Sequence, residues 1–372
     1  MQVGAGLLPA RLVWESGRDE LCPLPQHVER RKETMFVLKA HLSIYLLFLL
    51  CFPARGLGQV IFQDPSKHQI RFVTVEAGIR LEVLDWGGSG RPVVLLAGSG
   101  NTAHVFDDFA PKLTDCCHLY GITRRGYGAS SQPTSGYDDQ RLADDVLQVL
   151  DSLKIAAPVL VGHSMAGGEL TTLGSQHSER LAGLVYLDAL GDPRDFPAGD
   201  PAYMALFRQL PAPMRTPPPP PSDEESRSFR AYRVWQMRNQ KFAFPEAELR
   251  NGFATNPDGT MGAFKTPQRV HNAIGAGQKK REYSRIRVPV LAFFEYPRSA
   301  SGEYQPKNKE ERDAIEAYTS ATSAYVDRWV KNLKSGVPGA RIVDLPGAGH
   351  YVFLTREAEV LKGLREFVAG LR

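Results

Sequence analysis

The stretch Gly162-His163-Ser164-Met165-Ala166-Gly167, directly after the apolar run 158–161, is the feature that most constrains the fold of this chain. A short apolar run followed by small residues and then a helical pattern predicts a strand, a sharp turn and a helix. So tight a turn holds the serine in a strained backbone conformation, and its neighbours two residues away must be small, as Gly162 and Ala166 are. The turn would expose the Ser164 hydroxyl above a helix N-terminus, where developing negative charge is stabilised. We therefore predict that Ser164 is a nucleophile.

A histidine that could serve this nucleophile lies near the C-terminus. Residues 340–346 are typical of a strand, and the glycine-rich loop 347–351 that follows contains His350. A histidine in such a loop can turn its ring toward a serine on the turn of a neighbouring strand. We expect His350 to take the Ser164 proton and return it to the leaving group.

Short strands and helical segments alternate along much of the chain. Two alternating segments with Ala77-Gly78 between them, 68–76 and 79–86, predict an antiparallel hairpin. The remaining expected strands are 93–96, 118–123, 158–161, 184–187, 288–294 and 341–345, and the expected helices are 141–153, 168–176, 309–333 and 357–371. This alternation predicts an α/β fold, with a mainly parallel sheet covered by helices on both faces.

About one hundred residues, roughly 190–286, interrupt this alternation. A structureless loop of that length would be unusual, so we expect an inserted helical lid. It contains five consecutive prolines at 217–221, which we interpret as a spacer, and a helix start at 222–226. The aromatic residues within 229–242 could line a substrate pocket, but packing of an amphipathic helix predicts the same pattern and is favoured.

Three motifs that follow one another in the order expected of the family make the chain similar to the α/β-hydrolase family over most of residues 68–372. They are the run 123–131, in which Thr123 stands where the family usually has aspartate, the Gly-His-Ser-Met-Ala-Gly turn and the Pro-Gly-Ala-Gly-His loop 346–350. The resemblance implies the α/β-hydrolase fold and an enzyme of the serine esterase or perhydrolase branch. Thr123 at that position indicates a structural role there.

The resemblance also places the groups that would stabilise an oxyanion. In the family, one donor is the amide that follows the nucleophile, here that of Met165. The other comes from the loop after the third strand, here 97–101, where Ser99 is the candidate.

The acid that would orient His350 is ambiguous in the sequence. The commonest family position follows the seventh strand, where this chain has Glu295 one or two residues early. The other family position ends the sixth strand, where Asp188 stands. We favour Asp188 narrowly, keep Glu295 as the alternative, and regard Asp192 as a distant third.

The N-terminal region has the pattern of a secretory signal. A basic start at residues 35–41 is followed by an apolar run, 42–52, and by small residues at 53–58, so we expect a signal peptide over 35–58 and a hydrolase domain over 59–372. An uncleaved signal anchor is the alternative. Residues 1–34 form no recognisable domain, and we expect translation to begin at Met35. The expected location is secreted or periplasmic.

The charge balance excludes several classes of partner. With 45 basic and 41 acidic residues the net charge is +4, and there is no long basic run, so we expect neither nucleic-acid binding nor membrane binding beyond signal-peptide targeting. No Cys/His motif has metal-ligand spacing and no phosphate-binding pattern occurs, so no cofactor or metal is expected.

These observations predict a serine hydrolase that cleaves an ester-like small molecule through an acyl-enzyme intermediate. A perhydrolase or a C–C lyase would share the same motifs. A non-catalytic binding protein on this scaffold is the alternative of another class. The sequence does not predict the substrate or the oligomeric state.

Overall fold

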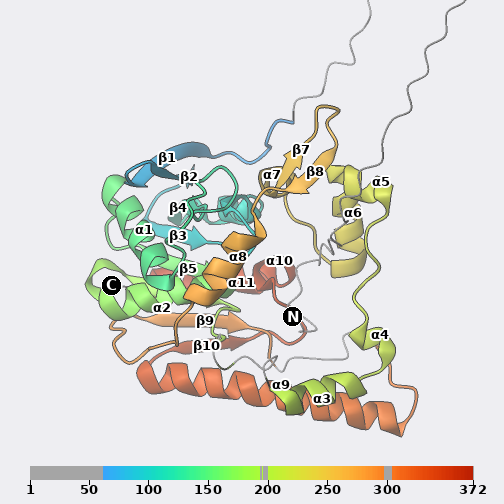
Figure 1. Cartoon of the computed structure of the whole chain (residues 1–372). Helices are drawn as coiled ribbons and strands as arrows, with labels where there is room; N and C mark the ends of the chain where they lie inside the picture. Colours follow the sequence, from blue (N-terminus) through green and yellow to red (C-terminus); the bar gives the residue numbers. More distant parts are fainter. Residues whose placement is uncertain (1–61, 193–194, 196–199, 297–303, 372) are drawn as a thin grey trace, which may run out of the picture. The chain divides into compact units, whose positions relative to one another are not determined.

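Eight strands form one sheet, in the order β1-β2-β4-β3-β5-β6-β9-β10. The computed structural model describes residues 62–192, 195, 200–296 and 304–371 (Figure 1), so the expectations for residues 1–58 lie outside the described part. Strands β4, β3, β5, β6, β9 and β10 pair in parallel with their neighbours in this order. Strands β1 and β2 form the expected antiparallel hairpin, and β2 also pairs antiparallel with β4. The bounds of the strands are β1 Gln69–Glu76, β2 Ile79–Gly87, β3 Arg91–Leu96, β4 Cys117–Ile122, β5 Val159–His163, β6 Gly183–Leu187, β9 Val290–Phe294 and β10 Arg341–Asp344.

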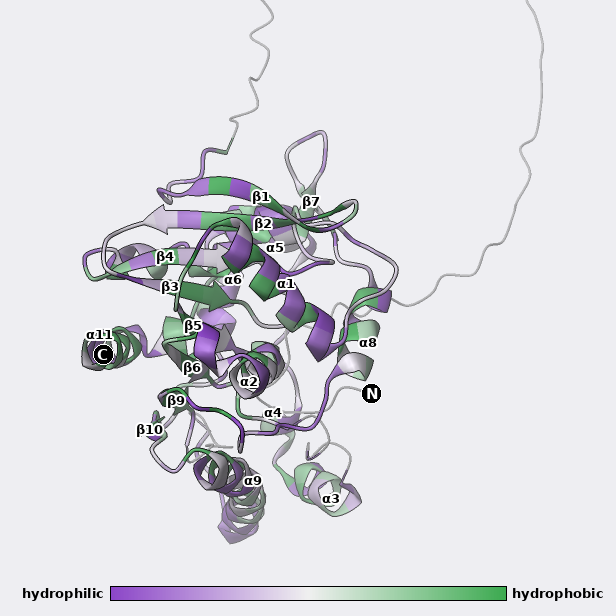
Figure 2. Ribbon diagram, turned by 90° about the vertical axis from the view of Figure 1, so that its left-hand side faces the viewer, coloured by the Kyte–Doolittle hydropathy of each residue, from purple (hydrophilic) through white to green (hydrophobic). Residues whose placement is uncertain are grey.

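Burial along the strands follows their place in the sheet. The inner strands β5, β6 and β9 are buried at every position, as their unbroken apolar sequences predict. The edge strand β1 is mostly exposed, and in Figure 2 its colours alternate between hydrophilic and hydrophobic residues. Because β3, β4, β5, β6, β9 and β10 pair in parallel, their C-terminal ends lie on the same side of the sheet.

Helices cover both faces of this sheet, which confirms the predicted α/β fold class. One face packs against α1, α2 and α9, and the opposite face packs against α10, α11 and the short helices η1 and η2. Figure 2 shows α11 on one side of the strands and α1 and α2 on the other. The bounds of these helices are η1 Ala103–Phe106, η2 Ala110–Leu113, α1 Asp139–Ser152, α2 Gly167–Gln176, α9 Lys309–Gly336, α10 Val352–Thr355 and α11 Glu357–Gly370.

The segment between β6 and β9 contains helices, as expected, and also a two-stranded hairpin that the sequence analysis did not predict. An Asp258-Gly259 turn joins the two strands, with Gly259 at φ +83°, and each strand is too short to show an alternating pattern. The elements of this inserted segment are α3 Pro201–Gln209, α4 Ala212–Arg215, α5 Asp223–Arg227, α6 Phe229–Gln240, α7 Glu246–Gly252, β7 Phe253–Thr255, β8 Met261–Phe264 and α8 Gln268–Gly277.

The aromatic residues of α6 mostly pack within the inserted segment. Phe229, Tyr232 and Trp235 are buried together, whereas Met237 is 53% exposed. Among the described residues, no helix has both the length and the apolar composition needed to cross a membrane.

Candidate active site

Ser164 lies on a sharp turn between β5 and α2, with a backbone φ of 56°. This left-handed conformation is strained for a residue with a side chain. The turn also needs small neighbours, because a Cβ on Gly162 would lie 3.0 Å from the Cβ of Ala166 and 2.6 Å from Leu170. Alanine is therefore accommodated at 166 because glycine occupies 162. Ser164 remains partly exposed within a buried stretch, so its hydroxyl is presented outward.

Ser164, His350 and Asp188 form a continuous chain of hydrogen bonds. The Ser164 Oγ lies 2.8 Å from His350 Nε2, and His350 Nδ1 lies 2.6 Å from Asp188 Oδ2. In this arrangement the Nδ1–H donates to the carboxylate, which leaves Nε2 to accept from the hydroxyl. Asp188 directly follows β6 at φ 44°, and its side chain is only 2% exposed. His350 follows Gly349, whose φ of 66° turns the loop back toward the sheet.

The other two carboxylates considered from the sequence occupy different surroundings. Both ring nitrogens of His350 are already engaged, by Ser164 and Asp188, so the geometry assigns no role to Glu295, which follows β9. Asp192 accepts a hydrogen bond from the backbone N–H of Arg281 at 3.3 Å. Asp188 is therefore the carboxylate that the structure brings to His350.

His163 also holds His350, a function that the sequence analysis missed. Its Nε2–H donates to the backbone carbonyl of His350 at 3.0 Å, and the two rings lie 4.6 Å apart. Burial, with a smaller contribution from the charge of His350, lowers the pKa of His163 to about 3. The ring is consequently neutral at physiological pH. The motif contains this residue, but its partner is 187 positions away in sequence, so no local signal indicates the contact.

The loop 97–101 after β3 passes directly against the nucleophile. A Cβ on Gly98 would lie 3.0 Å from the Cβ of Ser164 and 2.7 Å from His163 Nδ1, so only glycine permits this close approach. The Ser99 hydroxyl lies 3.4 Å from His271 Nδ1 on α8. Met165 packs in one buried cluster with Val270 and Ile274, also on α8. Both residues predicted to donate to an oxyanion thus lie between the nucleophile and the inserted segment.

The same loop is held by a buried carboxylate from the inserted segment. Glu248 on α7 accepts hydrogen bonds from Asn101 Nδ2 at 2.8 Å and from the Thr102 amide at 3.1 Å. Burial raises the pKa of Glu248 to about 7, even though these hydrogen bonds oppose the change. The Tyr351 hydroxyl in turn donates to Asn101 Oδ1 at 3.0 Å. The inserted segment is therefore connected through two side chains to the residue that follows His350.

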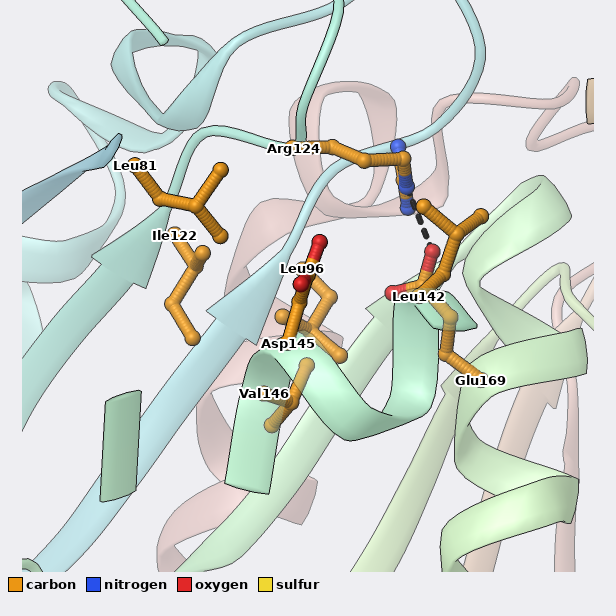
Figure 3. A pocket seen from close by; sticks show the side chains of 8 residues that line it. All are labelled: Leu81, Leu96, Ile122, Arg124, Leu142, Asp145, Val146 and Glu169. Carbon is orange, nitrogen blue, oxygen red and sulfur yellow. Dashed lines mark hydrogen bonds and ion pairs between the residues drawn. The ribbon is translucent and has the colours of Figure 1, made fainter. Parts of the chain in front are cut away.

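Beneath the loop lies a buried ion pair between Arg124 and Glu169 (Figure 3). Arg124 also donates to the carbonyl of Ala97 at 2.9 Å and so supports the start of the loop. The cavity beside this pair measures about 10 Å³, room for one water molecule at most, so it is no substrate site. Thr123 is fully buried, accepts from the Ala103 amide and donates to Glu82, which is the structural role expected of it.

Comparison with known proteins agrees with the observed fold. The model of the alpha/beta hydrolase family matches residues 93–362. Similar curated proteins include the non-heme chloroperoxidase CPO-A1 of Kitasatospora aureofaciens, 36% identical over 32% of this chain and 43% of that protein. Epoxide hydrolase A of Mycobacterium tuberculosis is 34% identical over 32% of this chain and 38% of that protein. The chain thus aligns with less than half the length of these relatives.

Solved structures share the architecture across most of the chain. A structure of E-2-(acetamidomethylene)succinate hydrolase covers 82% of this chain and 100% of its own, with a TM-score of 0.57 and 19% identity. Est816, described as an N-acyl homoserine lactone degrading enzyme, covers 80% of this chain and 100% of its own, with a TM-score of 0.51 and 22% identity. At these identities the likeness concerns the fold alone. The family match, the fold and the strand-end site together lead to one conclusion: the chain belongs to the alpha/beta hydrolase family.

Proposed function

We propose that this protein is a serine hydrolase that cleaves an ester-like small molecule through an acyl-enzyme intermediate. The observation that supports this most is the hydrogen-bonded chain from Ser164 through His350 to the buried Asp188. A serine hydroxyl is a weak nucleophile unless a base takes its proton. In these hydrogen bonds His350 is the base, and Asp188 orients it.

In the proposed first step, Ser164 Oγ bonds to the substrate carbonyl carbon while His350 Nε2 takes the hydroxyl proton. Asp188 stabilises the imidazolium that forms, and the amides of Met165 and Ser99 donate to the new oxyanion. The tetrahedral intermediate then breaks its bond to the leaving alcohol, which receives the proton from His350. Water repeats the sequence on the acyl-enzyme, releasing the acid and restoring Ser164. An oxyanion donor typically contributes about 3 kcal/mol to transition-state stabilisation.

Perhydrolysis at the same site is a second candidate, because a relative 36% identical to this chain over 120 residues is named a non-heme chloroperoxidase. Hydrogen peroxide would take the place of water in the second step and leave with the acyl group as a peracid. The resemblance of the elbow argues against epoxide opening, since family members with that chemistry use aspartate where this chain has Ser164.

We further propose that the inserted segment acts as a lid that selects the substrate. It approaches the site from two directions: Phe242 packs on Tyr351 at 4.9 Å, and His271 lies beside Ser99. A lid with aromatic side chains beside the histidine loop would limit the size of the acyl group. The signal-like sequence at 35–58 supports the proposal that the enzyme acts outside the cytoplasm, either in the periplasm or as a secreted protein.

The decisive experiment treats the protein, expressed from Gln59, with a fluorophosphonate probe and locates the adduct by peptide mass spectrometry. We expect labelling at Ser164 in the wild type and in Ser175→Ala, a control serine on α2 that bonds to the carbonyl of Thr171. Ser164→Ala should not be labelled. A folded wild type that stays unlabelled and hydrolyses no aryl ester would instead support the non-catalytic binding protein. Adding hydrogen peroxide to an active esterase and assaying peracid then separates hydrolysis from perhydrolysis.

A further inference from the structure

Two aspartates and two histidines outside the active site lie close together, two of them near the start of the described residues and two at η1. Asp64 and His68 precede β1, whereas His104 and Asp107 belong to η1 and its C-terminal end. One donor atom from each of the four residues lies within 4.8 Å of all the others. Their positions along the chain form no metal-binding motif, so the sequence analysis expected no metal here.

We propose that Asp64, His68, His104 and Asp107 bind a divalent transition-metal ion, Zn²⁺ first among them. Imidazole nitrogens and carboxylate oxygens are ligands that Zn²⁺ accepts in tetrahedral sites. Bonds of about 2.0–2.1 Å place the donors of a tetrahedral site roughly 3.3 Å apart.

The donor separations bracket that value. His104 Nδ1 lies 2.7 Å from Asp107 Oδ2 and 3.6 Å from Asp64 Oδ2. His68 Nδ1 lies 3.1 Å from Asp107 Oδ1, and one donor atom from each of the four residues lies within 4.8 Å of the others. Rotation of the side chains toward one another would therefore complete a four-ligand site, with one nitrogen of His68 and one oxygen of Asp107 as ligands.

A buried imidazole nitrogen of His68 is a second, independent observation. The His68 side chain is 4% exposed, and its Nδ1 makes no hydrogen bond of acceptable geometry among the described residues, although Asp107 Oδ1 lies 3.1 Å away. A buried ring nitrogen without a partner is costly, and coordination to an ion is one way to satisfy it. His68 Nδ1 lies within the group of donors, beside the Asp107 carboxylate.

The surroundings also resemble the outer shell of a metal site. A metal-binding histidine usually directs its second nitrogen to a carboxylate, and Glu82 Oε1 lies 3.7 Å from His104 Nε2. Ligating carboxylates are themselves hydrogen-bonded, and Trp86 Nε1 donates to Asp107 Oδ1 at 3.1 Å. The ion would join the segment before β1 to η1, which follows the loop 97–101, so its expected contribution is structural.

A proton on His104 is the competing occupant. Burial lowers the pKa of His104, but hydrogen bonds to Asp107 and the neighbouring carboxylates outweigh it and raise the pKa to about 12. The imidazolium of His104 could thus balance the charge of the buried carboxylates of Asp107 and Glu82 without any metal ion. The experiment must therefore detect the ion itself.

The test is a Co²⁺ and Zn²⁺ titration of the purified, chelator-treated chain. We expect one Co²⁺ per chain with the visible absorption of a tetrahedral site, displacement by Zn²⁺, and a rise in Tm of about 4 °C at a Zn²⁺ concentration 100 times Kd. His68→Gln and Asp64→Asn should lose the absorption and the rise in Tm. Asn at 64 can still accept the hydrogen bond from Ser66, which favours retention of the local fold.

A matched control is available in another histidine–aspartate pair. His118 Nε2 lies 2.8 Å from Asp85 Oδ1, and neither residue belongs to the four-residue group. His118→Gln should bind the metal as the wild type does. The absence of stoichiometric metal in the wild type, or equal binding by His68→Gln, would overturn the proposal and leave the protonated His104 as the occupant.

Discussion

Replacing Glu248 by Gln should change how the stability of the protein depends on pH. Glu248 is only 3% exposed, and burial raises the pKa of its carboxyl group from 4.5 to about 7. At a pH between these two pKa values, Glu248 is protonated in the folded protein and ionised in the unfolded chain. The stabilisation from Glu248 is therefore complete below pH 4.5 and is lost as the pH rises through about 7. Glutamine cannot titrate and removes this dependence.

The size of the effect follows from the two pKa values. A pKa of about 7 in the folded state and 4.5 in the unfolded state corresponds to about 3 kcal/mol between acidic and neutral pH. The variant also changes the hydrogen bonds to Asn101 and Thr102. Those changes contribute at every pH, so they largely cancel when the stability difference at one pH is subtracted from that at another.

The assay is urea unfolding of wild type and Glu248→Gln across the range from about pH 4.5 to about pH 8. The stability of the wild type relative to the variant should fall by about 3 kcal/mol on going from the acidic to the neutral end. For a folded unit of this size the same change corresponds to roughly 5 °C in Tm.

Glu246→Gln is the control for the loss of any carboxylate on α7. Glu246 is partly exposed and pairs with Arg250 at 2.7 Å, an i,i+4 pair that contributes about 0.2–0.5 kcal/mol. A stability difference between wild type and Glu248→Gln that stays constant with pH would refute the reasoning. It would mean that Glu248 is ionised in the folded protein throughout this range.

Four further substitutions test the active site. Asp188→Asn should lower kcat by about 10⁴-fold, because the amide favours the wrong His350 tautomer, whereas Glu295→Gln should change it little; the reverse result would assign the acid to Glu295. Gly98→Ala should lower kcat/KM roughly 100-fold, since its Cβ would lie 3.0 Å from the Cβ of the nucleophile, and a wild-type rate in ester hydrolysis would contradict this. His163→Phe leaves the carbonyl of His350 without its donor and should cost about 1–3 kcal/mol in urea unfolding; an unchanged stability would show that the hydrogen bond contributes nothing.

The sequence predicts most of the fold because its local patterns agree with one another. The apolar run before Ser164 and the glycine loop before His350 each identify a strand end without any tertiary information. The hairpin β7–β8 escaped detection because three- and four-residue strands are too short to establish a period. Its Asp258-Gly259 turn was the only local signal.

The parts of the site that the sequence left open depend on contacts between distant segments. The choice between Asp188 and Glu295 is a question of which neighbouring strand end faces His350, and local pattern does not decide it. The hydrogen bond from Asn101 to Glu248 spans 147 positions and joins a loop to an inserted helix. From residue types alone, His350 could pair with several carboxylates and Asn101 with many polar side chains.

The inserted segment leaves and re-enters the sheet at two adjacent strands, since Leu184 on β6 pairs with Val290 on β9. Because the two strands are parallel, the segment leaves at the C-terminal end of β6, beside the active site, and returns at the N-terminal end of β9, so it spans the length of the strands. Chimaeras whose insertions span the same distance could change substrate preference while the nucleophile, base and acid stay in place. Such a graft must, however, also supply the carboxylate of Glu248, or the loop beside the nucleophile loses its partner.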